Sequence, residues 1–322
     1  MIRALIVLVC ILVAPLISHA QHSGKVYRIG VLMYDGAPPG LLEAFRQGLN
    51  ELGYVDGRDV VMELRDAAGD KKQLGVLVEG LVRLPADVIL AVNTPAAQAA
   101  QKATTTIPIV ITRVGNPVKS GLVPSLAEPG GNITGTSLMH TELGAKRIEL
   151  LMEVLPNLAR VVVMSNADNP SHTPQVTEME LASTHFGLGF LSLTVHGPDD
   201  LPKAFQRAVQ AGAEALFVLD DTSFTRHREK LLELAAAYSL PVVSRYKDFA
   251  DSGALIAYGP SLDVYYRRSA YYVDRILKGV KPSDLPIEQP TRFDLAVNLK
   301  TARSLGLTIP PSLLIRADHI IE

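Results

Sequence analysis

The sequence predicts an α/β protein in which two doubly wound, parallel-sheet lobes are joined by a hinge. The first observation is that short apolar runs alternate, from Val26 onward, with segments whose apolar residues recur at helical spacing, as in successive βα units. The second is that the chain contains two such series without a low-complexity linker. The third is length, because about 300 residues exceed what one hydrophobic core usually organises.

The first series begins close to the N-terminus. Apolar residues at helical spacing mark helices at 41–52 and 74–82, and Gly53 ends the first of them. The expected strands are 27–33, 60–64, 88–92, 109–112 and 133–137.

The second series repeats this scheme after a helix at 142–155. A helix at 262–277 closes at Gly279, and the tail from 281 carries one strand-helix pair at 293–305 that we expect to wrap back over the body. The expected strands are 161–164, 190–195, 215–219, 241–244 and 255–258. The predicted lobe 1 comprises residues 25–138 plus 259–280, and the predicted lobe 2 comprises residues 139–258 plus 281–322.

Residues 1–20 are expected to be a signal peptide. Arg3, the apolar run 4–16 and the small residues before position 21 match a secretory signal, and the run is shorter than the ~20 residues that span a bilayer. Cys10, the only cysteine, lies inside it, and lipid attachment there is the weaker alternative because Val9 precedes it. Without this segment the chain has no cysteine, which excludes disulfides and thiol catalysis.

Charge is nearly balanced in this sequence. The 33 acidic and 31 basic residues form no blocks of one sign, which argues against a nucleic-acid or anionic-membrane partner. A small neutral or zwitterionic partner fits better.

The stretch 86–98 reads as a buried strand that runs directly into a helix. Thr94 is expected to be the N-cap and Pro95 the first helical residue, so that free backbone N–H groups point out of the carboxyl edge of the sheet. Such an edge is where open α/β sheets bind ligands, and small side chains would let a carboxylate approach. An ordinary βα connection with a good cap is the alternative.

A cleft between the lobes would be lined by the residues that follow the strands of both sheets. Such segments include 113–117 and 245–247, and Asn169 also lies in one. The predicted ligand-binding residues are Tyr34, Asn93, Thr94, Pro95, Ala96, Asn116, Ser137, Asn166, Asp220, Asp221 and Tyr246.

Two pairs among these residues have expected roles. Asp220 and Asp221 are the candidates for a ligand ammonium; alternatively, one of them caps the helix that begins near Phe224 and the other is solvated. Tyr34 and Tyr246 could offer a flat apolar surface to a ligand side chain, or simply be half-buried tyrosines.

Motifs for catalysis are absent from the sequence. It contains no G-x-S-x-G, H-E-x-x-H, Walker loop or G-x-G-x-x-G, and its histidines share no metal-ligand spacing. We therefore predict a protein that is not an enzyme, with no cofactor and no bound metal.

Several segments, in order along the whole exported chain, resemble ABC-transporter substrate-binding proteins of the tryptophan/tyrosine type. They are residues 45–54, 93–97, 129–135, 272–279, 285–290 and 298–302. The resemblance implies a type I periplasmic-binding fold, a periplasmic receptor, and delivery of a small solute to the subunits of an ABC permease. It also implies that the helix start at Thr94 faces the ligand carboxylate. We expect this receptor to be a monomer.

One departure from the family pattern concerns Asn116. Similar proteins often have Asp-Pro where this chain has Asn116-Pro117, so either Asp220 or Asp221 carries the ammonium contact or the ligand is not an amino acid. An exported enzyme on the same architecture and a receptor that signals to a membrane kinase are the alternative functions.

Overall fold

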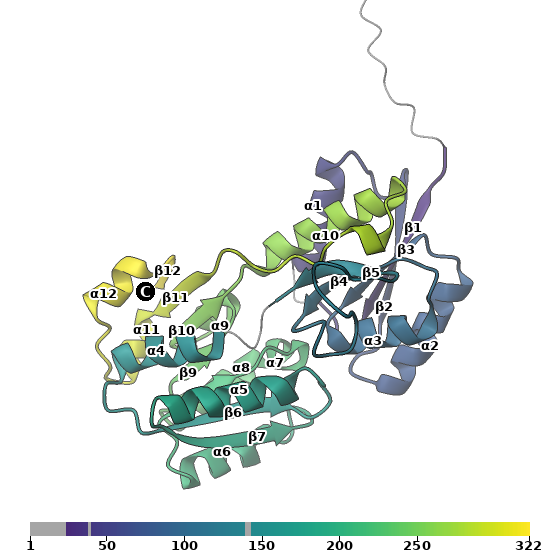
Figure 1. Ribbon diagram of the computed structural model, residues 1–322. Coiled ribbons are helices and arrows are strands. Elements are labelled where there is room, and N and C mark those ends of the chain that lie inside the picture. The colour runs from purple at the N-terminus through teal and green to yellow at the C-terminus, as the bar shows by residue number, and fades with distance from the viewer. Residues whose placement is uncertain (1–23, 38–39, 139–142) are drawn as a thin grey trace, which may run out of the picture.

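The computed structural model describes residues 24–37, 40–138 and 143–322, so the predicted signal peptide lies outside the described residues. Two sheets with covering helices form two lobes, and Figure 1 shows lobe 2 at the left and lobe 1 at the right. From here on, lobe 1 means the five-stranded sheet with the segments packed on it, and lobe 2 means the seven-stranded sheet with its own.

The sheet of lobe 1 has the strand order β2-β1-β3-β4-β5, and every pair is parallel. Successive residues of β1 face opposite sides, since Val31 packs in the core under one layer of helices and Leu32 in the core under the other. This two-sided burial is why the strands read as continuous apolar runs. The strands are β1 (Tyr27–Met33), β2 (Val60–Asp66), β3 (Val88–Val92), β4 (Ile109–Val114) and β5 (Ile133–Ser137).

Helices α1 (Leu41–Glu51) and α10 (Leu262–Leu277) cover one face of this sheet, and α2 (Lys71–Arg83) and α3 (Thr94–Ala103) cover the other. α1 and α10 are far apart in the sequence but lie side by side (Figure 1). Their close approach requires Gly48, because a Cβ there would lie 2.8 Å from the carbonyl oxygen of Arg267.

The sheet of lobe 2 has the order β12-β11-β10-β9-β8-β6-β7. Its pairs are parallel except that β11 runs antiparallel to β10, which the predicted parallel pattern did not include. The strands are β6 (Arg160–Asn166), β7 (Gly189–Val195), β8 (Ala215–Val218), β9 (Val242–Ser244), β10 (Ile256–Gly259), β11 (Asp294–Asn298) and β12 (His319–Ile321).

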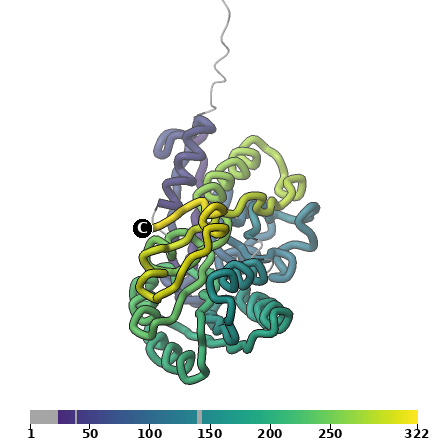
Figure 2. The backbone as a smooth tube through the Cα atoms, turned by 90° about the vertical axis from the view of Figure 1, so that its left-hand side faces the viewer, coloured from purple at the N-terminus to yellow at the C-terminus, as the bar shows by residue number. Residues whose placement is uncertain are grey.

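Helices cover both faces of this second sheet as well. Figure 2 shows the C-terminal segment, in yellow, against the green part of lobe 2, where β11 and β12 extend the sheet. The helices are α4 (Gly144–Val154), α5 (His172–His185), α6 (Leu201–Gln210), α7 (Thr222–Arg226), α8 (Arg228–Ala237), α9 (Lys247–Asp251), α11 (Leu299–Ser304) and α12 (Pro311–Arg316).

The segment that follows α10 differs from the predicted division of the chain. Leu285 and Ile287 pack in the cores of lobe 1, and the hydroxyl of Thr134 donates to the carbonyl of Leu285 at 2.6 Å. Residues 281–288, with the short 3₁₀ helix η2 (Pro282–Asp284), therefore lie on lobe 1 and not with the rest of the tail. None of the helices in the described parts of the chain is both long and apolar enough to cross a bilayer.

Candidate ligand-binding cleft

A small cavity lies where the carboxyl ends of strands from both sheets meet. It measures about 10 Å³, which is room for a single water molecule. The lobes are thus closed on each other in this structure. The cavity is lined by Asn93, Thr94 and Arg113 from lobe 1 and by Asn169, Ser171, Asp220, Asp221 and Thr222 from lobe 2.

Arg113, in β4, spans the cleft. Its Nη2 donates to Oδ1 of Asp220 at 2.6 Å and its Nη1 to the hydroxyl of Thr222 at 3.3 Å. The side chains of Arg113 and Asp220 are only 1% and 4% exposed. Burial alone would lower the pKa of Arg113, but Asp220 outweighs it and raises that pKa above the ordinary value. The pair is therefore a fully charged contact between the lobes.

Two cavity residues have unusual backbones. Asn93 has φ 78° and ψ 168°, and Arg113 has φ 58°. Of the non-glycine residues in the described ranges only Ala68 and Ser239 also have positive φ, so half of these strained positions line the cavity. Such strain costs about 1–3 kcal/mol per residue and concentrates at functional sites.

The N-cap of α3 differs from the predicted one. The N-cap is Asn93, whose Oδ1 accepts from the backbone N–H of Ala96 at 3.2 Å, and Thr94 is already the first helical residue. The prediction was wrong by one residue because Thr and Asn are both good caps, and only the backbone conformation chooses between them.

The two adjacent aspartates are both engaged. Asp221 caps α7 through the N–H of Ser223 at 2.9 Å, and it also accepts from Asn166 and Asn169 at 2.9 and 2.8 Å. Asp220 accepts from Arg113 and from the hydroxyl of Tyr246 at 2.9 Å. In the closed arrangement Asp221 fills the capping role that was the alternative, and a guanidinium stands where a ligand ammonium was expected.

The other predicted residues lie around the cavity without lining it. Tyr34 and Ala96 are buried in a core of lobe 1. The ring centroid of Tyr246 lies 5.6 Å from the guanidinium of Arg113 and 5.7 Å from that of Arg245. Asn116 accepts from the N–H of Lys119, and Ser137 donates to the carbonyl of Gly115. Pro95 lines a separate groove of about 580 Å³ at the rim of the cleft.

Four residues that line the cavity are not among the predicted ligand-binding residues: Arg113, Asn169, Ser171 and Thr222. All but Ser171 lie in the strand-end segments that were expected to line a cleft. In the sequence, Arg113 stands out as the one charged residue in the run 109–114, all of which is buried in the structure. Asn169 and Thr222 follow predicted strands and have side chains suited to a polar site. Ser171 gave no signal, because its place depends on how the chain turns into α5.

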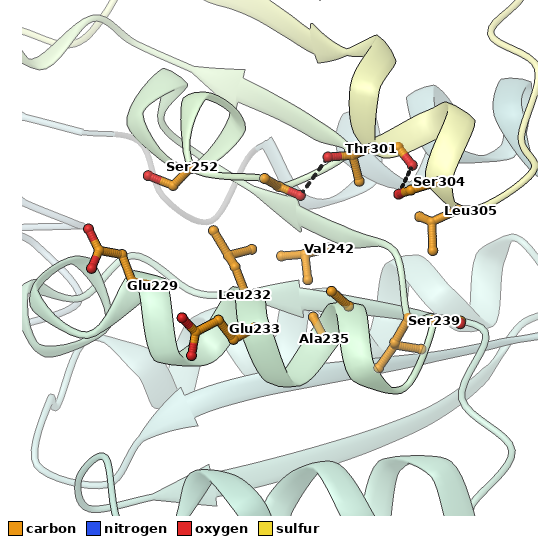
Figure 3. Close-up of a pocket in the computed structure, with 13 residues that line it drawn as sticks. Glu229, Leu232, Glu233, Ala235, Ser239, Val242, Ser252, Thr301, Ser304 and Leu305 are labelled. Atoms are coloured by element: carbon orange, nitrogen blue, oxygen red, sulfur yellow. Dashed lines mark hydrogen bonds between the residues drawn. The ribbon is translucent and has the colours of Figure 1, made fainter.

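Another hollow, of about 440 Å³, lies on lobe 2 between α8 and α11, away from the cleft (Figure 3). The hydroxyl of Thr301 in its wall donates to the carbonyl of Gly253 at 3.0 Å. None of the predicted ligand-binding residues lines this hollow. Within the part of the chain that the structure describes, no three His, Cys, Asp or Glu side chains are grouped to hold a metal ion.

Comparison with known proteins identifies the family. The profile of the family "ABC transporter substrate binding protein" matches residues 38–321. The chain belongs to this family. This ABC transporter substrate-binding protein is also 25% identical, over 82% of its own length and 76% of the relative's, to the tyrosine-binding protein of Clostridioides difficile strain R20291.

Two solved structures have the same two-lobed fold. A conserved domain protein from Vibrio cholerae is 28% identical, with a TM-score of 0.86 over 92% of this chain and all of that one. A domain from Streptococcus pneumonia in complex with L-Trp is 24% identical, with the same score and coverage. These likenesses confirm the predicted type I periplasmic-binding fold.

Proposed function

We propose that this substrate-binding protein captures a small carboxylate-bearing solute, an amino acid or an aromatic relative, in the cleft and delivers it to an ABC permease. The observation that carries the proposal is the start of α3 at the cavity. Backbone N–H groups at this helix end, held by the strained Asn93 and flanked by small side chains, suit a carboxylate. The tyrosine-binding and tryptophan-bound relatives support this class of solute.

Opening of the lobes would make room for the solute. Arg226 of lobe 2 pairs with Asp35 of lobe 1 at 2.8 Å. Two further ion pairs between the lobes have lysines that are more than half exposed, namely Lys71 with Asp168 at 2.9 Å and Lys119 with Glu178 at 2.7 Å. Exposed pairs of this kind contribute only ~0–1 kcal/mol each, so breaking them costs little. Among the described residues, we place the hinge where the chain passes between the sheets, between β10 and α10 and at 289–293.

The proposal also includes the site of action. The signal peptide expected at 1–20 would export the protein to the periplasm, where it would act as a monomer that presents its solute to the permease subunits. No chemistry on the solute is part of this function, so the solute recovered from the protein should be unaltered.

Replacing Thr94 tests the position of the site. Thr94 is 2% exposed and lines the cavity, so Thr94→Phe should fill the space at the helix start. The protein, freed of bound solute, is screened by thermal shift against amino acids, aromatic acids and small carboxylates. A ligand at a hundredfold over its Kd adds about 2.7 kcal/mol of stability, which a melting curve resolves.

We expect a shift with one class of these compounds, lost in Thr94→Phe but retained in Thr105→Phe. Thr105 is exposed beyond the other end of α3, so this variant controls for added apolar surface. Equal affinity in Thr94→Phe would refute the position of the site, and absence of any shift across the panel would refute the proposed solute class.

A further inference from the structure

Three buried arginines meet next to the cleft. Arg113, Arg147 and Arg245 are 3%, 4% and 2% exposed. The guanidiniums of Arg113 and Arg245 both lie within 6 Å of the Tyr246 ring. Arg113 is neutralised by Asp220, whereas the structure gives neither Arg147 nor Arg245 an ion pair with a described carboxylate.

Arg147 and Arg245 each have one hydrogen-bond partner but leave other donors unsatisfied. Nε of Arg147 donates to the carbonyl of Tyr258 at 2.9 Å and Nη2 of Arg245 donates to the carbonyl of Leu138. Nη2 of Arg147 and both Nε and Nη1 of Arg245 are buried without any partner. Burial, and then the charge of Arg245, lower the pKa of Arg147 to about 9, so it still carries its charge at neutral pH.

Such an arrangement is unfavourable for an empty protein. Buried charges are ordinarily paired, and unpartnered buried donors lose their water without compensation. A water molecule could accept some of these bonds but would not balance two positive charges. An anion would do both.

The position of Arg245 connects these donors with the cleft. Arg245 directly follows β9 in lobe 2, yet its guanidinium reaches the carbonyl of Leu138 at the end of lobe 1. It also shares the Tyr246 ring with Arg113 of the cleft. Arg245 is thus one aromatic ring away from Arg113, which lines the cavity, although neither Arg245 nor Arg147 lines it in the closed form.

We propose that Arg147 and Arg245 form an anion site for the solute, so that the cleft selects solutes of net negative charge over zwitterionic amino acids. This inference rests on the proposed function and narrows its solute class. The proposal also accounts for Arg113. Its guanidinium is hydrogen-bonded to the carboxylate of Asp220, so this carboxylate is not available to a ligand ammonium.

Matched pairs of solutes test the selectivity. Each amino acid is compared by calorimetry with the acid that lacks only its ammonium: tyrosine with hydroxyphenylpropanoate, phenylalanine with phenylpropanoate, tryptophan with indolepropanoate, and glutamate with glutarate. We expect the deaminated member of each binding pair to bind about tenfold or more tightly. Tighter binding of the amino acid would overturn the inference and leave the proposed function intact, whereas no binding by any pair would overturn both.

Variants of Arg147 test the site itself. Arg147→Met should abolish the preference, and Arg147→Lys, which keeps the charge, should retain part of it. Without solute, Arg147→Met should melt no lower than the parent, since it removes an uncompensated charge. A lower melting temperature together with an unchanged preference would show a structural role only. Arg83→Met, at an arginine 78% exposed and paired with Glu79, is the control and should change neither quantity.

Discussion

Gly135 shows how a single residue shapes the cleft. It has φ 134° and faces Ile111 across the β4–β5 pair, where the register shifts between Ile111 and Val114. This irregularity lies beside Arg113, whose side chain spans the cleft. A bulge next to a site commonly redirects one side chain, and glycine permits the close approach that it needs here.

Gly135→Ala is accordingly expected to lower the free energy of unfolding by about 3 kcal/mol, measured by urea denaturation. A Cβ there would lie 2.6 Å from the backbone nitrogen of Ile111, in a conformation that alanine rarely adopts. Gly80→Ala is the control: a Cβ in this turn of α2 meets nothing within 4 Å, so it should stabilise by about 0.5–1 kcal/mol. Similar stability for both variants would contradict this account.

Asp35 is a second single residue with a testable effect, because its carboxyl group should make the stability of the protein depend on pH. Burial raises its pKa from 3.8 to about 6, although Arg226 of lobe 2 lies 2.8 Å away and lowers it. The folded chain thus binds this proton more tightly than the unfolded chain, and the contribution of Asp35 to stability falls as pH rises from about 4 to about 6.

The Asp35→Asn variant should not lose this contribution to stability as pH rises, because asparagine does not ionise. The melting temperature of the variant minus that of the parent should therefore increase between pH 4 and pH 7, as measured by calorimetry at several pH values. A difference that stays constant, or that falls, would show that burial does not govern this carboxyl.

At the scale of the element, α3 depends on its strained cap. Asn93 contributes a hydrogen bond to the N–H of Ala96 but adopts a φ of 78°, which only glycine adopts freely. The two contributions oppose each other, and two substitutions separate them.

Asn93→Ala loses the cap and keeps the strain, so we expect it to lose about 1–2 kcal/mol of stability. Asn93→Gly loses the cap bond but relieves the strain, so its stability should match or exceed that of the parent. Chemical denaturation measures both. If glycine proves as destabilising as alanine, the backbone at Asn93 is not strained.

At the scale of the whole molecule, the buried Arg113–Asp220 pair joins the lobes. Asp220→Asn would leave a buried guanidinium without its counter-charge in the closed form, which costs about 3–5 kcal/mol, and opening would return it to water. The radius of gyration from small-angle scattering without solute should therefore rise in this variant.

Asp168→Asn provides the comparison for this change. Its partner Lys71 is 58% exposed, so the pair contributes at most about 1 kcal/mol and the scattering should change little. Equal profiles for both variants would show that the buried pair does not hold the lobes together.

The order of strands and helices was determined by the sequence itself, because burial on both faces of a sheet leaves continuous apolar runs with helices between them. Strands 27–33 and 133–137 and helix 262–277 have the predicted bounds. The resemblance of several segments, such as 129–135, likewise identified the family that the comparison confirms.

Only the tertiary structure decided which of the strand-end residues meet. Asn93, Thr94, Asp220 and Asp221 converge on one cavity, whereas Tyr34 turns into a core, since a side chain at a strand end can face either way. Two partners of Asp220 come from β4 and from the segment after β9, both distant in the sequence. Contacts between such distant segments depend on how the lobes pack, and no local pattern of residues encodes that packing.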